Sequence, residues 1–161
     1  STFGAQLAAH LGLPYAFASH FAPDYLQHAL KAYRENFRPS RYLSKPYVAA
    51  AMNVFAADSE TDARKMMSSM QQQFIALRRG TPGPLKAPVD DIRTVAAPHE
   101  LAGANHALTY TAVGTKDSVQ RHINQFIDDT GIDEVILTCH AFDHQARLRS
   151  LEIAAEALNG K

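Results

Sequence analysis

The sequence predicts an α/β protein in which parallel strands alternate with covering helices, on three observations. Nearly continuous apolar runs at residues 13–19, 47–57 and 134–139 are typical of parallel strands buried on both faces. Segments with apolar residues three and four positions apart, typical of helices, separate these runs. Turns at residues 1–4 and 113–115 combine hydroxyl side chains with glycine and open onto helices. The first turn has no strand before it, so we expect the chain to begin part-way through a larger architecture.

The composition is that of an ordinary globular domain. The 161 residues are 46% hydrophobic and 20% charged, enough for one sizeable core, so residues 1–161 are expected to form a single domain. Sixteen basic and sixteen acidic side chains cancel without a block of like charge, so neither nucleic acid nor an anionic membrane is an expected partner. No apolar run approaches the ~20 residues that span a bilayer, and no charged-then-apolar leader is visible. The single Cys139 cannot form an internal disulfide, which favours a cytoplasmic location.

The first part of the chain reads as helix, strand and helix. A helix at about residues 3–11 ends at Gly12, which suits a left-handed helix cap. The apolar run at 13–19 follows directly, and its continuity predicts an inner strand. Apolar residues at helical spacing then predict an amphipathic helix over residues 23–37, which stops before Pro39.

The second strand, at residues 47–57, leads into a long helix. The acidic segment 58–62 contains a capping serine and favours a helix start, and the helix is expected to run to Arg79. Two methionines four residues apart could suggest a soft metal-ligand set, but their spacing fits the core face of a helix better. The predicted core stripe consists of Met66, Met70, Phe74 and Leu77.

Residues 80–98 interrupt this alternation with a proline- and glycine-rich excursion that cannot sustain a helix or a central strand. A loop of this length inside a compact domain is typically a functional cover or a linker, and we favour a cover that orders over the site when a ligand binds. Regular structure is then expected to resume as helix, strand, helix, strand and helix, at residues 98–108, 109–113, 116–129, 134–139 and 142–158.

Several stretches carry a family resemblance when they are taken in order. They are GAQLAAHLGLPYAFASHFAP, KPYVAAAMNVFAADSETDARKM, QQQFIALRRGTPGPL and VGTKDSVQRHINQFIDDTGIDEVILTCHAFDHQARLRSLEIAAE. Together they resemble the C-terminal half of the bacterial luciferase-like, flavin-dependent monooxygenase family. The resemblance implies a TIM (β/α)8 barrel, of which this chain would supply strands six to eight with their helices. It also implies a missing N-terminal half as partner.

In that family reduced FMN lies at the carboxyl mouth of the barrel, with its phosphate held by the loop after strand five. The resemblance puts Ser1, Thr2, Phe3 and Gly4 at that loop. Hydroxyls and backbone N–H groups at the start of a helix suit an anion, so these four residues are the expected phosphate cradle. The alternative is that Ser1 or Thr2 only caps the helix.

Three residues end the first strand at the same mouth of the barrel. Ala18 and Ser19 are small enough for a flat isoalloxazine ring to lie against the backbone, so they are expected to contact the flavin. His20 is the candidate catalytic residue, because it could donate a hydrogen bond to flavin or substrate, or act as an acid or base near neutral pH. Its alternative role is a hydrogen bond to a neighbouring loop, and the resemblance assigns it no catalytic role.

The last strand ends in a cluster of reactive residue types, Thr138, Cys139 and His140, followed by Asp143 and His144. Their spacing matches no zinc motif, so no metal site is expected. No signature of an orienting group or oxyanion hole accompanies Cys139, which is therefore expected to pack at the strand end.

Two functions remain open at this point. The resemblance implies an enzyme in which FMN, in its reduced form, and molecular oxygen oxidise a small organic substrate. The alternative is a non-catalytic half-barrel that serves as a binding or assembly module. In either case an open parallel sheet would leave unpaired apolar edges, so we expect the isolated chain either to form a dimer or larger homo-oligomer or to need the missing N-terminal half to be soluble.

Overall fold

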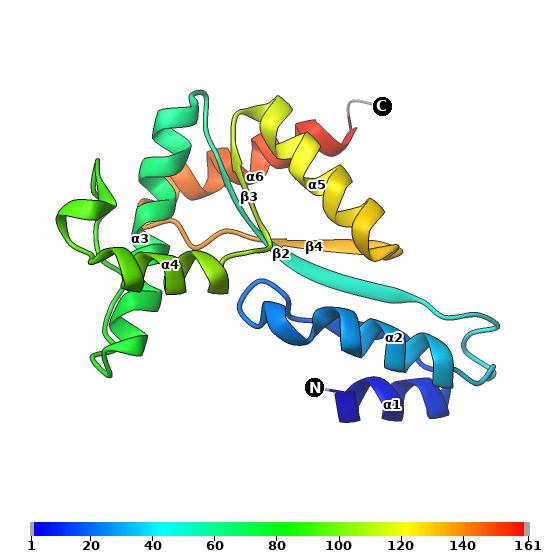
Figure 1. The fold of residues 1–161 in the computed structure, drawn as a ribbon. Coiled ribbons are helices and arrows are strands. Elements are labelled where there is room, and N and C mark those ends of the chain that lie inside the picture. Colours follow the sequence, from blue (N-terminus) through cyan, green and yellow to red (C-terminus); the bar gives the residue numbers. More distant parts are fainter. Residues whose placement is uncertain (1, 160–161) are drawn as a thin grey trace.

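The computed structural model describes residues 2–159, which form one parallel β-sheet with helices packed around it (Figure 1). The strands are β1 Tyr15–Phe17, β2 Val48–Ala56, β3 Thr111–Gly114 and β4 Glu134–Thr138. β2 is the central strand and pairs in parallel with the other three. β4 overlaps both β1 and β3 in register, so it lies on one edge of β2, while β1 and β3 follow one another along the opposite edge.

Six α-helices are described in residues 2–159: α1 Thr2–Leu11, α2 Leu26–Asn36, α3 Glu60–Arg78, α4 Pro98–Ala107, α5 Lys116–Thr130 and α6 His144–Asn159. Short 3-10 turns at Pro23–Tyr25 and Ile92–Thr94 precede α2 and α4. In Figure 1, α1 and α2 lie together below the sheet, α5 and α6 lie above it, and α3 and α4 lie to its left. The α/β class and the order of elements predicted from the sequence are therefore confirmed.

A single hydrophobic core joins one face of the sheet to these helices. Even-numbered side chains of β2, from Val48 to Val54, are buried in one cluster with residues of α1, α2, α5 and α6. The opposite face carries mostly small side chains and is less covered. On it, Ala16 is exposed and Ile136 keeps 39% of its surface accessible. The sheet thus has one face buried by helices and one that remains partly open.

The first strand is shorter than predicted, because β1 has three residues in place of the expected run at 13–19. Pro14 has no N–H to donate to a ladder, and Ser19 turns its side chain back onto β2. Within residues 2–159, β1 pairs with β2 alone and is an edge strand, whereas an inner strand was expected. The predicted cap at Gly12 is confirmed by its φ of +61°.

The predicted core stripe of α3 is wrong in part. Leu77 is 51% exposed, and Met66, Met70 and Phe74 are only half-buried. The buried positions of the helix are instead Ala63, Ser68, Ser69 and Ile75. Small residues face inward because α3 packs closely against α4 and β3.

The excursion between α3 and α4 folds back along α3. The backbone of Val89 exchanges two hydrogen bonds with the hydroxyl of Ser68, at 2.8 and 3.1 Å. The amide of Gln72 donates to the carbonyl of Ala87 at 2.9 Å. These contacts anchor the middle of the segment, and its role as a cover stays a prediction. None of the described helices is both long and apolar enough to cross a membrane.

Candidate functional site

At the carboxyl edge of the sheet, where ligands of parallel α/β proteins usually bind, β1 and β4 end on opposite sides of β2. Phe17 at the end of β1 pairs with Ala50, and Thr138 at the end of β4 pairs with Asn53. Asn53, fully buried near the end of β2, connects them. Its amide nitrogen donates to the carbonyl of His20 at 2.7 Å, and its amide oxygen accepts from the hydroxyl of Thr138 at 3.2 Å. The segment after β1 and the end of β4 are therefore fixed on either side of a single amide.

His20 lies half-buried at this edge, directly after β1. Its Nδ1 atom is buried and has no hydrogen-bond partner in residues 2–159. Its ring meets that of Phe21 edge-on, with the ring centres 5.3 Å apart. Burial lowers the pKa of His20, and the nearby His140 lowers it further. The imidazole is thus held mainly neutral near pH 7, with a nitrogen that no described group satisfies.

The two small residues before His20 differ in their surroundings. Ser19 is fully buried and its hydroxyl donates to the carbonyl of Ala51 at 2.5 Å. This bond fills the gap between β1 and β3 along β2, so the Ser19 hydroxyl already has a structural use. Ala18 is half-buried beside it. Both lie at the predicted edge, and a contact of either with flavin stays a prediction.

The predicted phosphate cradle falls at the start of α1. Ser1 lies outside the described residues, and Thr2, Phe3 and Gly4 form the first turn of the helix. Only three residues join α1 to β1, and in Figure 1 the first turn of α1 lies below the middle of the molecule, beside the end marked N. The first turn of α1 contains no acidic side chain, in contrast to those of α3, α4 and α5. An anion there would meet no carboxylate of this helix turn.

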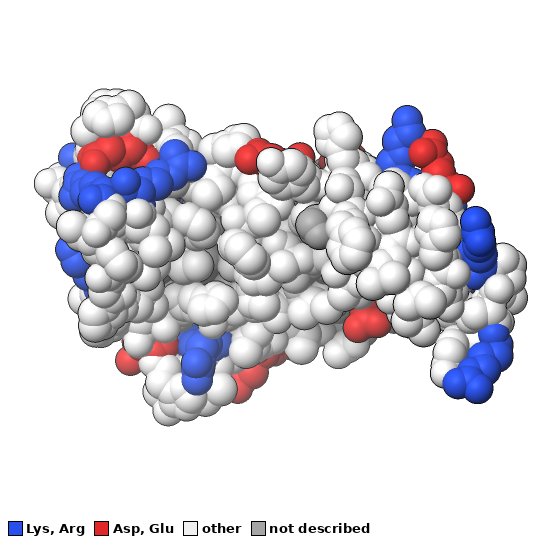
Figure 2. Space-filling model, turned by 90° about the horizontal axis from the view of Figure 1, so that it is seen from below, with Lys and Arg blue, Asp and Glu red and all other residues white. Residues whose placement is uncertain are grey.

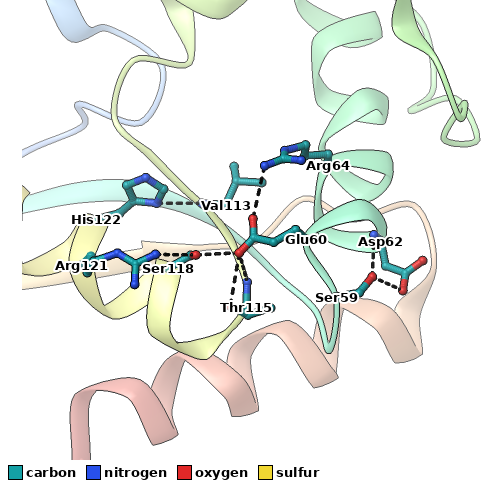
Figure 3. Close-up of polar contacts among 9 residues, drawn as sticks. All are labelled: Ser59, Glu60, Asp62, Arg64, Val113, Thr115, Ser118, Arg121 and His122. Atoms are coloured by element: carbon teal, nitrogen blue, oxygen red, sulfur yellow. Dashed lines mark hydrogen bonds and ion pairs between the residues drawn. The ribbon is translucent and has the colours of Figure 1, made fainter.

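The start of α5 binds a carboxylate of the chain itself (Figure 3). The Glu60 carboxylate accepts hydrogen bonds from the backbone N–H of Thr115 at 3.1 Å and from the hydroxyl of Ser118 at 2.6 Å. A side chain on Gly114, whose φ is +129°, would place Cβ only 2.6 Å from this carboxylate. These hydrogen bonds, chiefly that from Ser118, lower the pKa of Glu60. Glu60 thereby joins the β2–α3 junction to the β3–α5 turn.

The residues that end β4 make contacts within the chain. Cys139 packs against the core, and burial raises the pKa of its thiol, which agrees with the predicted packing role. Asp143 accepts from the backbone N–H of Ala146 at 2.7 Å and so caps α6, while His144 contacts Arg147. In the described part of the chain, no three His, Cys, Asp or Glu side chains are grouped to hold a metal ion.

No family model matches the sequence. A protein named luciferase-like monooxygenase from Escherichia coli K12 is 47% identical over 156 residues, which are 97% of this chain and 47% of that protein. This chain belongs to the luciferase-like monooxygenase family. The uncharacterized protein YvbT of Bacillus subtilis is 40% identical over 97% of this chain and 46% of its own length. The chain thus spans about half the length of the curated family members it matches.

Solved structures agree with this family assignment in fold. Apo-MsnO8 superposes with a TM-score of 0.77 at 25% identity, covering 98% of this chain and 49% of that one. The long-chain alkane monooxygenase LadA gives a TM-score of 0.64 at 14% identity, over 99% of this chain and 39% of LadA. At that identity the likeness to LadA concerns the fold alone.

Two residues of this candidate site were not singled out from the sequence. Asn53 stands alone in an otherwise apolar run, and that isolation is the signal that could have identified it. Glu60 was interpreted only as an acidic helix start, because its partners Thr115 and Ser118 lie more than fifty residues away. No local pattern indicates such a contact.

Proposed function

We propose that this chain is the C-terminal half of a flavin-dependent luciferase-like monooxygenase that oxidises a small organic substrate with molecular oxygen. Its 47% identity to a protein of that name supports the reaction class. Among the similar folds, a Baeyer–Villiger monooxygenase from Pseudomonas putida was solved in complex with FMN, at 20% identity and a TM-score of 0.59. Two further similar folds are named as F420-dependent enzymes, so a deazaflavin is the nearest alternative cofactor.

The orphaned Nδ1 atom of His20 carries the proposal. A buried imidazole nitrogen without a partner is costly, and a ligand group at the carboxyl edge would satisfy it. The adjoining face of the sheet bears Ala16, Ala49 and Ala51, small side chains over which a flat ring can lie. These features fit a flavin held against β1 and β2, with His20 as hydrogen-bond partner of the flavin or the substrate.

The flavin phosphate would bind at the first turn of α1, to Thr2, Phe3 and Gly4, with Ser1 as a further candidate. Backbone N–H groups and the helix dipole favour a dianion there. The bound flavin would supply the redox chemistry with oxygen. The residues of this chain would orient the ring, exclude water and position a proton at His20.

A partner half is supported by what this chain leaves open. Among the described strands, β1 and β4 each pair only with β2, so each has an edge without a strand partner. On α1, Phe3, Leu7 and Leu11 follow one another at four-residue spacing and are 71%, 48% and 54% exposed. Closing the strands into a barrel would pair the edges and cover this stripe.

The cofactor assignment is tested by comparing FMN with riboflavin, which lacks the phosphate. We expect FMN to bind the complete protein at least about tenfold more tightly, because the phosphate adds charge-assisted hydrogen bonds at α1. Fluorescence quenching of each flavin on titration with protein measures both affinities. Equal affinities would remove the phosphate role of residues 1–4, and absence of binding by both would favour the non-catalytic half-barrel.

The role of His20 is tested with His20→Ala and His20→Gln in the complete protein. We expect His20→Ala to weaken flavin binding or turnover by about tenfold or more, and His20→Gln to recover part of the loss because an amide can still hydrogen-bond. His28→Ala, a histidine on the exposed side of α2, serves as the matched control. Activity and flavin affinity unchanged by His20→Ala would contradict the assignment.

A further inference from the structure

A pocket of about 280 Å³ lies beyond the end of β2, between the first turns of α3 and α6. More than half of its eleven lining residues are apolar. They are Ala56, Ala57, Met66, Pro88, Phe142 and Ala146. Ala56 is the last residue of β2 and Ala57 follows it, while Pro88 comes from the anchored middle of the excursion. Three separate segments therefore build the pocket at the carboxyl end of the central strand.

The charged residues of the pocket are turned toward protein partners. Asp58 accepts from Arg149 at 2.8 Å, and Lys65 lies 2.7 Å from Asp90. The remaining two carboxylates also have partners: Asp62 accepts from the hydroxyl of Ser59, the N-cap of α3, at 2.6 Å, and Asp143 caps α6. A charged ligand would have to break one of these contacts or remain uncompensated.

Size and lining together restrict the occupant. An apolar cavity of about 150 Å³ holds one benzene molecule, so about 280 Å³ suits a molecule up to twice that size. Phe142, which is 54% exposed, offers an aromatic wall at the opening. His140, one of the two histidines at the carboxyl edge, precedes Phe142 by two residues.

We propose that this pocket binds small, uncharged, largely apolar organic molecules, and that it is the part of this chain that receives the substrate's apolar body. The second statement rests on the proposed monooxygenase function, whereas the first does not. The ligand would enter past Phe142 and contact Met66, Pro88 and Ala146. Its uncharged polar end would point outward, toward the carboxyl edge of the sheet.

Three six-carbon probes whose head groups are neutral, negative and positive test the selectivity. Hexanol, hexanoate and hexylammonium are titrated into the complete protein while the methyl signal of Met66, assigned with Met66→Leu, is followed by NMR. We expect a saturable shift with hexanol and at least fivefold weaker binding of both charged probes. No saturable shift with hexanol, or equal binding of all three probes, would overturn the proposal.

Variants locate the binding. Ala146→Leu fills the pocket from α6 and should abolish the hexanol shift, while Ala155→Leu on the exposed side of the same helix should leave it unchanged. Phe142→Ala removes the wall without crowding the core and should weaken hexanol binding by about threefold or more. Unchanged binding in both pocket variants would show that hexanol sits elsewhere.

Flavin titration of the same samples separates the two proposals. Hexanol binding without flavin binding would keep the pocket and reject the monooxygenase. Flavin binding without hexanol binding would keep the monooxygenase and reject the pocket.

Discussion

The amide of Asn53 holds the backbone after β1 and the hydroxyl that ends β4 at one buried point. Asn53→Leu keeps a similar side-chain volume but leaves the His20 carbonyl and the Thr138 hydroxyl without this partner. We expect a loss of about 1–3 kcal/mol in the free energy of unfolding, the cost of leaving a buried polar group unsatisfied. Urea denaturation of the chain measures it.

The matched control for this prediction is Asn105→Leu. Asn105 is exposed and accepts a hydrogen bond from Gln71 at 2.8 Å, so its replacement should change the free energy of unfolding by less than about 0.5 kcal/mol. Equal effects of the two substitutions would mean that the Asn53 amide is not what fixes the carboxyl edge.

For single residues, the sequence predicted which polar groups lie at strand ends better than it predicted their hydrogen-bond partners. His20 and Thr138 were placed at strand ends by the apolar runs before them, and the structure brings both to Asn53. Ser19 was expected near the flavin because of its small size, which stays a prediction, and the bond of its hydroxyl to β2 was not predicted. Strand periodicity predicts the face of a side chain but gives no information on an acceptor thirty residues away.

Between elements, the C-terminal end of α3 is joined to the start of α4 by Arg79 and Glu100. The guanidinium donates to both carboxylate oxygens, at 2.6 and 2.7 Å, and the backbone N–H of Ala97 donates to one of them at 2.9 Å. The bond from Arg79, followed by that from Ala97, lowers the pKa of Glu100 from its ordinary 4.5 to about 2. Glu100 therefore closes the excursion by fixing its two ends together.

This lowered pKa predicts an acid-sensitive junction. A carboxylate whose pKa is lower in the folded state contributes stability that is fully present above its unfolded pKa and is lost as pH falls through the folded value. For Glu100 that window runs from about pH 4.5 down to about 2. We expect Glu100→Gln to destabilise the chain at pH 6 and the two proteins to converge near pH 2.

Urea midpoints measured from pH 6 to pH 2 test this expectation. Glu35→Gln is the control. Glu35 is exposed and its carboxylate lies 3.8 Å from Lys31, and an exposed ion pair contributes little to stability. Its removal should therefore leave the fall in stability between pH 6 and pH 2 unchanged. A constant difference between wild type and Glu100→Gln over the whole pH range would contradict a titrating Glu100. Glu60 and Asp91 also have lowered pKa values. The stability of the Glu100→Gln variant should therefore still fall between pH 6 and pH 2, but less steeply than that of the wild type.

The elements themselves were largely predictable, because apolar periodicity and helix-end residues are local signals. The bounds of β2, α5 and α6 differ from those predicted by at most two residues. The errors have tertiary causes. β1 is short because Pro14 and Ser19 remove its ends from the ladder, and α3 buries small residues because α4 and β3 approach it closely.

For the molecule as a whole, charge is distributed unevenly over the surface. Figure 2, which looks from below at the face where α1 lies, shows Lys, Arg, Asp and Glu toward the ends and rims and a broad uncharged middle. Residues 2–11 contain no charged side chain of these four types. Within α1, Phe3, Leu7 and Leu11 are exposed. A face with little charge repulsion and an apolar stripe favours association.

The isolated chain should therefore associate. Unpaired edges on β1 and β4 and the apolar stripe on α1 each remain open within the described residues, and water satisfies only the backbone groups. We expect light scattering to give a dimer or larger species, in place of a 17.7 kDa monomer. Replacing Leu7 and Leu11 by Gln should lower the association constant at least about tenfold, while Leu151→Gln on α6 should have little effect.

If the N-terminal half of a curated relative is added, a one-to-one complex should replace the self-associated form, because barrel closure uses the same edges. A well-ordered monomer with a cooperative thermal transition would contradict both the open edges and the half-barrel, since the strands would then have closed without a partner.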